Sequence, residues 1–388
     1  MTEPIGLQQE KTDDRKEIIE QKIYQSLGAD AYCVSDEKLM ERIDAYIIEE
    51  NNQKRIPLNK RVELRNELFY SFRGFGMLSS LLNDETISEI MVNNDGKVFF
   101  EKEGKLSRYE KDFSDSRKLN DMIQKMVAYS KRKVNESTPI VDARLEDGSR
   151  INIVLPPVAI GGAVVTIRKF PENALTKEAM IANRTLSEET AQLLQKLVEQ
   201  KKNIFIFGGT GSGKTTLLNM MSEFIGEDER IITVEDSAEL QIHRIKNLVR
   251  MEARMTDDPE LADVTIRDLI KCALRQRPDR IVVGEVRGVE AFDMLNAMNT
   301  GHEGSLSTGH ANSAADMLTR LEMMILSGME IPYRPVQKLI ASAIDYLVEI
   351  RRMNDGSRKV CGIYRLVGLK QDEYEIENVF TLGGKKDC

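Results

Sequence analysis

The stretch Gly208-Gly209-Thr210-Gly211-Ser212-Gly213-Lys214-Thr215-Thr216 decides the fold class of this chain. It matches the phosphate-binding loop G-x-x-x-x-G-K-[ST], in which glycine backbone N–H groups surround phosphate oxygens. The segment 203–207 before it, apolar after Asn203, is typical of a buried strand, and residues 217–221 after it suit a helix. A strand, this loop and a helix in succession predict a nucleotide-binding α/β domain rather than a simple glycine-rich turn.

Two side chains of the loop have separate roles in such a site. Lys214 can reach the β- and γ-phosphates of a nucleoside triphosphate, and the Thr215 hydroxyl is placed to ligate Mg²⁺. The N-terminus of the following helix adds partial positive charge beside the phosphates. We therefore expect residues 208–216 to bind ATP or ADP together with Mg²⁺.

Composition indicates a soluble globular protein of two or three domains. The chain has 388 residues, 41% of them hydrophobic and 30% charged, and a net charge of −8 that argues against a dedicated nucleic-acid binder. No apolar run is long enough to span a membrane, and the polar N-terminus does not resemble a signal peptide. We therefore expect a cytoplasmic protein without direct membrane insertion, which meets a membrane only through partners.

Cysteine and histidine usage indicates neither disulfides nor a zinc site. The three histidines have no metal-binding spacing, and the scattered cysteines predict reduced thiols. The four cysteines are Cys33, Cys272, Cys361 and Cys388.

The N-terminal half predicts two different kinds of structure. Residues 1–75 form charged amphipathic segments, at 10–27, 36–51 and 59–72, that predict a small helical bundle. Residues 76–170 predict a small α+β domain, in which Asp147-Gly148 marks a hairpin turn. Its expected elements are strands 87–92, 98–101 and 106–109, helix 119–129, and strands 150–155 and 163–169. Residues 171–186 resemble a linker.

Residues 187–388 alternate strands and helices around the phosphate loop. Ser187 is a plausible N-cap for a helix over 188–199, and Thr265-x-x-Asp268 resembles a capping box. This alternation predicts a largely parallel sheet covered by helices on both faces. The expected elements are strand 204–207, helix 215–224, strand 231–234, helix 265–274 and strand 281–283.

Two carboxylates follow apolar strands downstream of the phosphate loop. Glu235 comes after the strand 231–234, and Glu285 after the segment 281–284. Parallel α/β sheets bind ligands at the carboxyl ends of their strands, where a carboxylate can orient the attacking water or hold Mg²⁺ through water. Acids at strand ends also act as helix caps, but two of them after a phosphate loop favour catalysis.

Two of the three histidines stand in a repeated Thr-Gly-His context. They are His302, after Thr300-Gly301, and His310, after Thr308-Gly309. The surrounding glycine, serine and threonine residues allow the backbone to approach phosphate closely. We expect these histidines to sense the γ-phosphate rather than to be ordinary loop residues.

With these motifs, the chain resembles the ATPases of type II and type IV secretion systems. It most resembles the CpaF-like ATPase of Tad (Flp, type IVb) pilus assembly. The resemblance covers about residues 76–360. The matching motifs are the phosphate loop, the acidic segment 233–240, the segment 277–287 with Gly-Glu where most phosphate-loop enzymes have Asp, and the histidine segment 300–312.

The resemblance implies a fold and a set of site residues. The fold is α/β, a RecA-like P-loop NTPase motor domain with a smaller α+β N-terminal domain and an all-helical N-terminal extension. Glu235 would polarise the water and Glu285 would organise Mg²⁺ through water, although these two roles could be exchanged. His310 would contact the γ-phosphate, with His302 second. The small domain would supply arginines to the phosphates, first Arg150 and Arg168 and then Arg144.

The implied function is Mg²⁺-dependent ATP hydrolysis by a homo-hexameric ring. Such a ring would lie at the inner face of the cytoplasmic membrane and act on a membrane-embedded platform protein to assemble a pilus. One alternative is a type IV secretion ATPase that moves protein or DNA. A nucleic-acid translocase and a regulatory nucleotide-binding module are further alternatives, the first disfavoured by net charge and the second by the two strand-end glutamates.

Overall fold

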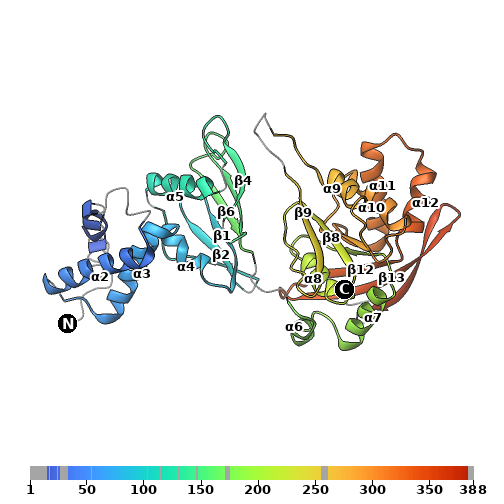
Figure 1. The fold of residues 1–388 in the computed structure, drawn as a ribbon, viewed down its shortest axis with the longest axis horizontal. Helices are drawn as coiled ribbons and strands as arrows, with labels where there is room; N and C mark the ends of the chain where they lie inside the picture. The colour runs from blue at the N-terminus through green and yellow to red at the C-terminus, as the bar shows by residue number, and fades with distance from the viewer. Residues whose placement is uncertain are drawn as a thin grey trace. The chain divides into compact units, whose positions relative to one another are not determined.

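The computed structural model describes residues 15–382 apart from 17, 24, 27–33, 54, 103, 114, 130–131, 146, 171–174 and 255–260. Its internal contacts divide the chain into two compact units, Met1–Glu172 and Asn173–Cys388 (Figure 1). In the part of the chain that the structure describes, no helix combines the length and the apolar character needed to cross a bilayer.

The first unit begins with helices that share one hydrophobic cluster. Helices α2 (Asp36–Gln53) and α3 (Leu58–Arg73) confirm the expected helices over 36–51 and 59–72. Of the helix expected over 10–27, residues 18–23 are helical, whereas Gly28-Ala29-Asp30 lie outside the described residues. The apolar stripes of these helices bury the same cluster, which includes Ile19, Ile23, Leu39, Ile43, Leu64 and Leu68.

The rest of the first unit is an antiparallel sheet with a helix packed on it. After the short helices η2 (Gly76–Leu78) and α4 (Ser79–Leu82), six strands pair in the order β3-β2-β1-β6-β5-β4. Helix α5 (Ser116–Tyr129) packs its apolar face on alternate strand residues such as Ile151 and Ile167. The strands are β1 (Ile87–Val92), β2 (Val98–Lys102), β3 (Lys105–Arg108), β4 (Ile140–Arg144), β5 (Arg150–Val154) and β6 (Val164–Arg168).

The second unit is built on an eight-stranded sheet of order β14-β13-β12-β7-β11-β10-β8-β9. The strands from β12 to β9 in this order run parallel, and β13 and β14 pair antiparallel at the β12 edge. The strands are β7 (Ile204–Phe207), β8 (Arg230–Glu235), β9 (Asn247–Glu252), β10 (Arg280–Val283), β11 (Leu306–Gly309), β12 (Tyr346–Arg352), β13 (Arg358–Lys370) and β14 (Glu373–Thr381).

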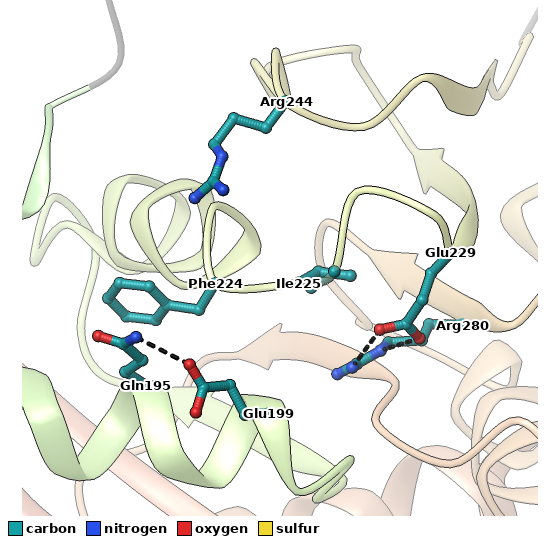
Figure 2. Close-up of a pocket in the computed structure, with 8 residues that line it drawn as sticks. Gln195, Glu199, Phe224, Ile225, Glu229, Arg244 and Arg280 are labelled. Atoms are coloured by element: carbon teal, nitrogen blue, oxygen red, sulfur yellow. Dashed lines mark hydrogen bonds and ion pairs between the residues drawn. The ribbon is translucent and has the colours of Figure 1, made fainter.

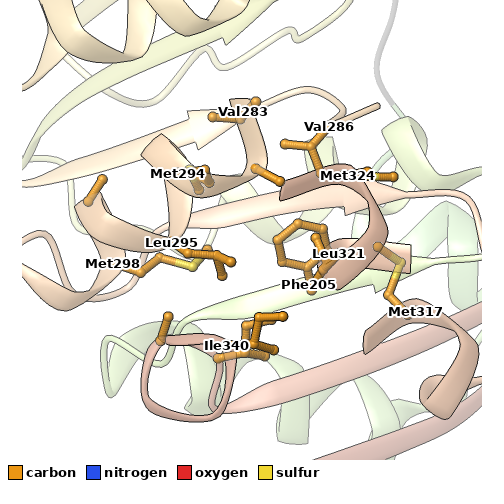
Figure 3. Packing of buried hydrophobic residues seen from close by; sticks show 14 of the residues in the cluster. Phe205, Val283, Val286, Met294, Leu295, Met298, Met317, Leu321, Met324 and Ile340 are labelled. Atoms are coloured by element: carbon orange, nitrogen blue, oxygen red, sulfur yellow. The ribbon is translucent and has the colours of Figure 1, made fainter. Parts of the chain in front are cut away.

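Helices cover both faces of this sheet, as the alternation predicted. Successive side chains of β7 enter opposite layers, with Phe205 and Phe207 in one cluster and Ile204 and Ile206 in the other. Figure 3 shows Phe205 among methionine and leucine side chains of the first cluster. That layer contains α9 (Ile266–Ala273), α10 (Glu290–Asn299), α11 (Ala314–Gly328) and α12 (Tyr333–Ala343). The opposite layer contains α6 (Lys177–Ala182), α7 (Glu188–Glu199) and α8 (Lys214–Ser222).

Local signals for helix starts are confirmed. The Ser187 hydroxyl accepts a hydrogen bond from the Thr190 N–H at 3.1 Å, and the Thr265–Asp268 capping box is complete. The segment 171–186 contains helix α6, and its Met180 is buried in the core of the second unit. Cys272 and Cys361 are free thiols, while Cys33 and Cys388 lie outside the described residues.

Candidate functional site

The phosphate loop follows strand β7 and has a backbone that only glycine accommodates well. Gly211 and Gly213 have positive φ angles of 68° and 96°, in the left-handed region. A Cβ on Gly208 would collide with the Ile350 carbonyl oxygen of the neighbouring strand β12. Helix α8 begins within this segment, at Lys214, so that its first N–H groups belong to the loop.

Lys214 lies inside the loop rather than in solvent. Its side chain is buried, and Nζ donates to the carbonyl oxygens of Gly208 at 3.3 Å and Gly209 at 3.0 Å. The same Nζ lies 3.3 Å from Nδ1 and 3.4 Å from Nε2 of His310. The ammonium group is therefore held at the centre of the loop, where phosphate would bind.

Three of the expected site residues stand at the same edge of the sheet. Glu235 is the last residue of β8, Glu285 comes two residues after β10, and His310 directly follows β11. Strands β7, β11, β10 and β8 are parallel neighbours, so their carboxyl ends lie side by side. The fold thereby brings these three residues and Lys214 to the edge where α/β sheets bind ligands.

Direct contacts link Lys214 to the two strand-end loops. Nε2 of His310 is 2.8 Å from Oε1 of Glu285, and Arg287 donates from Nη2 to Oε2 of Glu285 at 3.0 Å. Burial lowers the pKa of His310, against the opposing effect of Glu285, so the ring is neutral at pH 7. A ring nitrogen of the neutral ring can accept from Lys214, whereas the 2.8 Å approach of Nε2 to Glu285 is not a hydrogen bond, since Oε1 of Glu285 has no hydrogen-bond partner among the described residues.

Glu235 is buried and held by the backbone of its own loop. Its side chain is 2% exposed, and Oε2 accepts from the N–H groups of Glu239 at 2.7 Å and Leu240 at 2.8 Å. Oε1 has no hydrogen-bond partner among the described residues. Burial raises the pKa of Glu235 to about 7, although the two N–H groups oppose this shift. A carboxylate with a pKa near neutrality can take up a proton at physiological pH.

The oxygen donors around the loop suit a magnesium ion. The Thr215 hydroxyl is on the first turn of α8, and the buried Ser212 hydroxyl has no hydrogen-bond partner among the described residues. Mg²⁺ binds oxygen donors and usually keeps several waters beside one or two protein ligands and the substrate phosphates. Thr215 and Glu285 fit this pattern, with Glu285 acting through water.

The three expected arginines form a row within the first unit. Arg144 pairs in register with Arg150 across β4 and β5, and Arg150 pairs with Arg168 across β5 and β6. Directly paired residues project from the same face of a sheet, and this is the face opposite the buried Ile151 and Ile167. The fold therefore collects three guanidinium groups from three successive strands on one surface.

His302, which we expected to be a second γ-phosphate contact, lies at the opposite edge of its sheet from Lys214 and His310. It precedes β11, and its Nδ1 lies 3.3 Å from the Ala297 carbonyl oxygen at the end of α10. At about 3.3 Å per residue, β11 alone separates the two histidines by roughly 13 Å. The repeated Thr-Gly-His pattern thus marks opposite ends of one strand, and only His310 reaches Lys214.

A cavity of about 360 Å³ also lies at the edge away from the phosphate loop (Figure 2). Arg280, the first residue of β10, donates to Glu229 at 2.7 and 2.8 Å and to the Val198 carbonyl oxygen at 2.8 Å. Its side chain is fully buried. These charges neutralise each other, and we assign the cavity a structural rather than a catalytic role.

Two arginines at the site were given no role by the sequence. Arg287 bonds Glu285, and Arg358 bonds the phosphate loop by donating from Nε to the Gly211 carbonyl oxygen at 3.1 Å. Arg287 stands two residues after the strand-end acid Glu285, and this spacing could have marked it as a site residue from the sequence. Arg358 follows the turn dipeptide Asp355-Gly356, which predicts a hairpin but does not predict that this hairpin lies beside the phosphate loop.

Comparison with known proteins gives the fold and the family. The solved structure described as the pilus retraction motor PilT with bound ADP covers 79% of this chain and 83% of its own, with a TM-score of 0.53 and 19% identity. This likeness confirms the RecA-like α/β fold, which the parallel sheet and phosphate loop of the second unit already indicated.

Sequence relatives are closer. The chain is 34% identical over 313 residues to a putative conjugal transfer protein of Mycobacterium tuberculosis, covering 79% of this chain and 87% of that protein. It is 32% identical over 303 residues to the type IV secretion system protein PtlH of Bordetella pertussis, covering 72% and 89%. The family model described as type II/IV secretion system protein matches residues 72–371. The chain is therefore a member of the type II/IV secretion system protein family.

Proposed function

We propose that this chain is an ATPase that hydrolyses ATP at the phosphate-loop edge of its second unit. The observation that carries this proposal is the direct contact of Lys214, His310 and Glu285, with Glu235 on the adjacent strand end. Groups that bind phosphate and groups that can handle a proton converge on one edge of one sheet. A regulatory module without turnover would not need the two carboxylates.

Each residue has a role in phosphoryl transfer to water. The loop N–H groups and Lys214 bind the β- and γ-phosphates, which replace the carbonyl contacts that Lys214 now makes. Glu235, with a pKa of about 7, orients the attacking water and accepts its proton. The neutral ring of His310 carries a single N–H, which would donate to the γ-phosphate in the nucleotide complex, with Glu285 beside the ring.

Magnesium would be held by Thr215, the nucleotide phosphates and, through water, Glu285. When bound, the ion neutralises charge on the phosphate oxygens. The segment around Glu285 has no aspartate to hold the metal, so Thr215 and water molecules carry more of its coordination. Glu235 remains the acceptor of the proton in this scheme.

The arginine row of the first unit completes the site in our proposal. Arg150 and Arg168, with Arg144 beside them, would contact the γ-phosphate when residues 76–170 close on a motor domain formed by residues 187–388. Segment 171–186 would then join the two domains, and the helices of 1–75 would form a separate extension. Guanidinium groups in a row neutralise charge that develops during transfer.

Membership of the family supports a role in a secretion machine. We propose a cytoplasmic homo-hexameric ring, peripheral at the membrane, that works on a platform protein during pilus assembly of the Tad type. The relatives are named as conjugal transfer and type IV secretion proteins, and this favours type IV secretion as a second candidate. A nucleic-acid translocase is disfavoured by the net charge of −8.

The proposal is tested by ATP turnover of the purified full chain with Mg²⁺, in the presence and absence of single-stranded and duplex DNA. We expect hydrolysis that DNA does not stimulate. Turnover that requires DNA would favour the translocase. An absence of hydrolysis under all of these conditions, in protein shown to be folded, would contradict the ATPase assignment.

A further inference from the structure

The end of the β12–β13 hairpin lies against the outer side of the phosphate loop. Strand β12 runs parallel to β7 with Glu349 opposite Phe207, so it arrives beside the loop that follows Phe207. From β13, Arg358 donates from Nε to the Gly211 carbonyl oxygen at 3.1 Å. Its Cδ would lie 3.3 Å from a Cβ on Gly213. Arg358 therefore packs along the loop as well as bonding to it.

The hairpin presents Arg358 from a well-defined turn. The Met353 N–H donates to the Ser357 carbonyl oxygen at 2.7 Å, and Asp355 accepts from the N–H of Ser357 at 2.9 Å. Gly356 supplies the positive φ angle of 85° that the turn requires. A side chain that begins on a closed hairpin holds its direction better than one on an open loop.

The carbonyl that Arg358 holds belongs to the same peptide group as the Ser212 N–H. In a trans peptide the C=O and N–H point in opposite directions. The Gly211 carbonyl points outward to Arg358, so the Ser212 N–H points inward, where it donates to the Gly209 carbonyl oxygen at 3.4 Å. That interior is also where Lys214 places its ammonium group.

We propose that Arg358 is a positioning residue of the phosphate loop, acting within its own subunit. Its guanidinium fixes the Gly211–Ser212 peptide so that the Ser212 N–H faces the nucleotide phosphates, and it adds positive charge behind the loop. This inference rests on the proposed nucleotide site. Since ADP and ATP share the β-phosphate, toward which we place the Ser212 N–H, Arg358 supports the binding of both equally and contributes to KM rather than to kcat.

The test compares Arg358→Ala and Arg358→Lys with Arg365→Ala. Arg365 is on the same strand, is exposed, and pairs with Glu377 at 3.6 Å, so it is a matched control. We expect Arg358→Ala to weaken ADP and ATP affinity by the same factor of about ten, equivalent to ~1.4 kcal/mol. KM should rise with kcat nearly unchanged. Arg358→Lys keeps the charge without the planar donor fork, and we expect an intermediate affinity.

Two results would overturn the inference. One is an ADP affinity for Arg358→Ala within about twofold of that for Arg365→Ala. The other is a fall in kcat with KM unchanged, which would place Arg358 in the chemical step. Failure of the proposed function looks different, because the wild-type chain itself would then show no ATP turnover, whatever the ADP affinity of the variants. Thermal unfolding of each variant in the absence of nucleotide checks that the hairpin remains folded.

Discussion

Replacement of Glu235 by glutamine should remove one specific pH dependence from the stability of this protein. The folded chain holds the Glu235 carboxyl with a pKa of about 7, raised by burial from a usual value of 4.5. The folded state therefore keeps a proton that the unfolded chain releases. Glu235 consequently makes the wild-type protein less stable as the pH rises from the pKa of 4.5 in the unfolded chain through the pKa of about 7 in the folded chain.

The size of this effect follows from the two pKa values. The full cost of ionising Glu235 in its buried position is about 3 kcal/mol, because each pKa unit is worth ~1.4 kcal/mol. Between about pH 5.5 and about pH 8.5, ionisation of Glu235 should lower the free energy of unfolding of the wild type by about 2 kcal/mol. Glutamine does not titrate, so Glu235→Gln should gain about 2 kcal/mol relative to the wild type over this interval.

Matched urea denaturation curves at several pH values measure this difference. The absolute stability of the variant at a single pH is less informative, because the amide N–H₂ group is itself costly to bury without a partner. Glu252→Gln is the control, since Glu252 pairs with Glu235 in the register of β8 and β9 but is exposed. If the difference in the free energy of unfolding between Glu235→Gln and the wild type stayed constant across the whole pH range, the claim that buried Glu235 takes up a proton near pH 7 would be refuted.

The other predictions concern turnover and assembly. Glu285→Gln should keep ATP binding and lose most turnover, because the amide keeps the shape but not the charge that faces His310 and Arg287; a wild-type steady-state rate would remove Glu285 from the mechanism. Arg168→Ala should lower turnover by about 10³-fold or more with ADP affinity little changed, since ADP lacks the γ-phosphate; equal losses in both would contradict the γ-phosphate contact. Light scattering with ATP and Mg²⁺ should give the mass of six chains, and a monomer at high protein concentration would count against a ring.

Local sequence patterns predicted those parts of the fold that local physics determines. The phosphate loop needs glycine at the positive φ angles of Gly211 and Gly213, and that requirement is visible in the sequence. The Ser187 cap works within one helical turn, and the apolar run 204–207 is buried on both faces as its composition indicated. The position of Glu235, Glu285 and His310 at the carboxyl ends of neighbouring strands agrees with the parallel sheet that the sequence predicted, while their roles stay a prediction.

What the sequence did not reveal depends on long-range packing. The contact of Arg358 with Gly211 joins residues 147 positions apart, and it exists because β12 pairs with β7. The position of His302 depends on where β11 begins, which the repeated Thr-Gly-His pattern does not encode. Helix α6 is short and packs through Met180, so its apolar content was too small to distinguish it from a linker.

The central claim is that this phosphate loop binds and hydrolyses ATP, and Lys214→Ala tests it most directly. The measurement is steady-state ATP turnover of the wild-type chain and the variant, after circular dichroism has shown that both are folded. We predict turnover in the wild type and none measurable in Lys214→Ala, because the phosphates lose the ammonium group that the loop holds at its centre. A folded Lys214→Ala variant that hydrolyses ATP at nearly the wild-type rate would contradict the account.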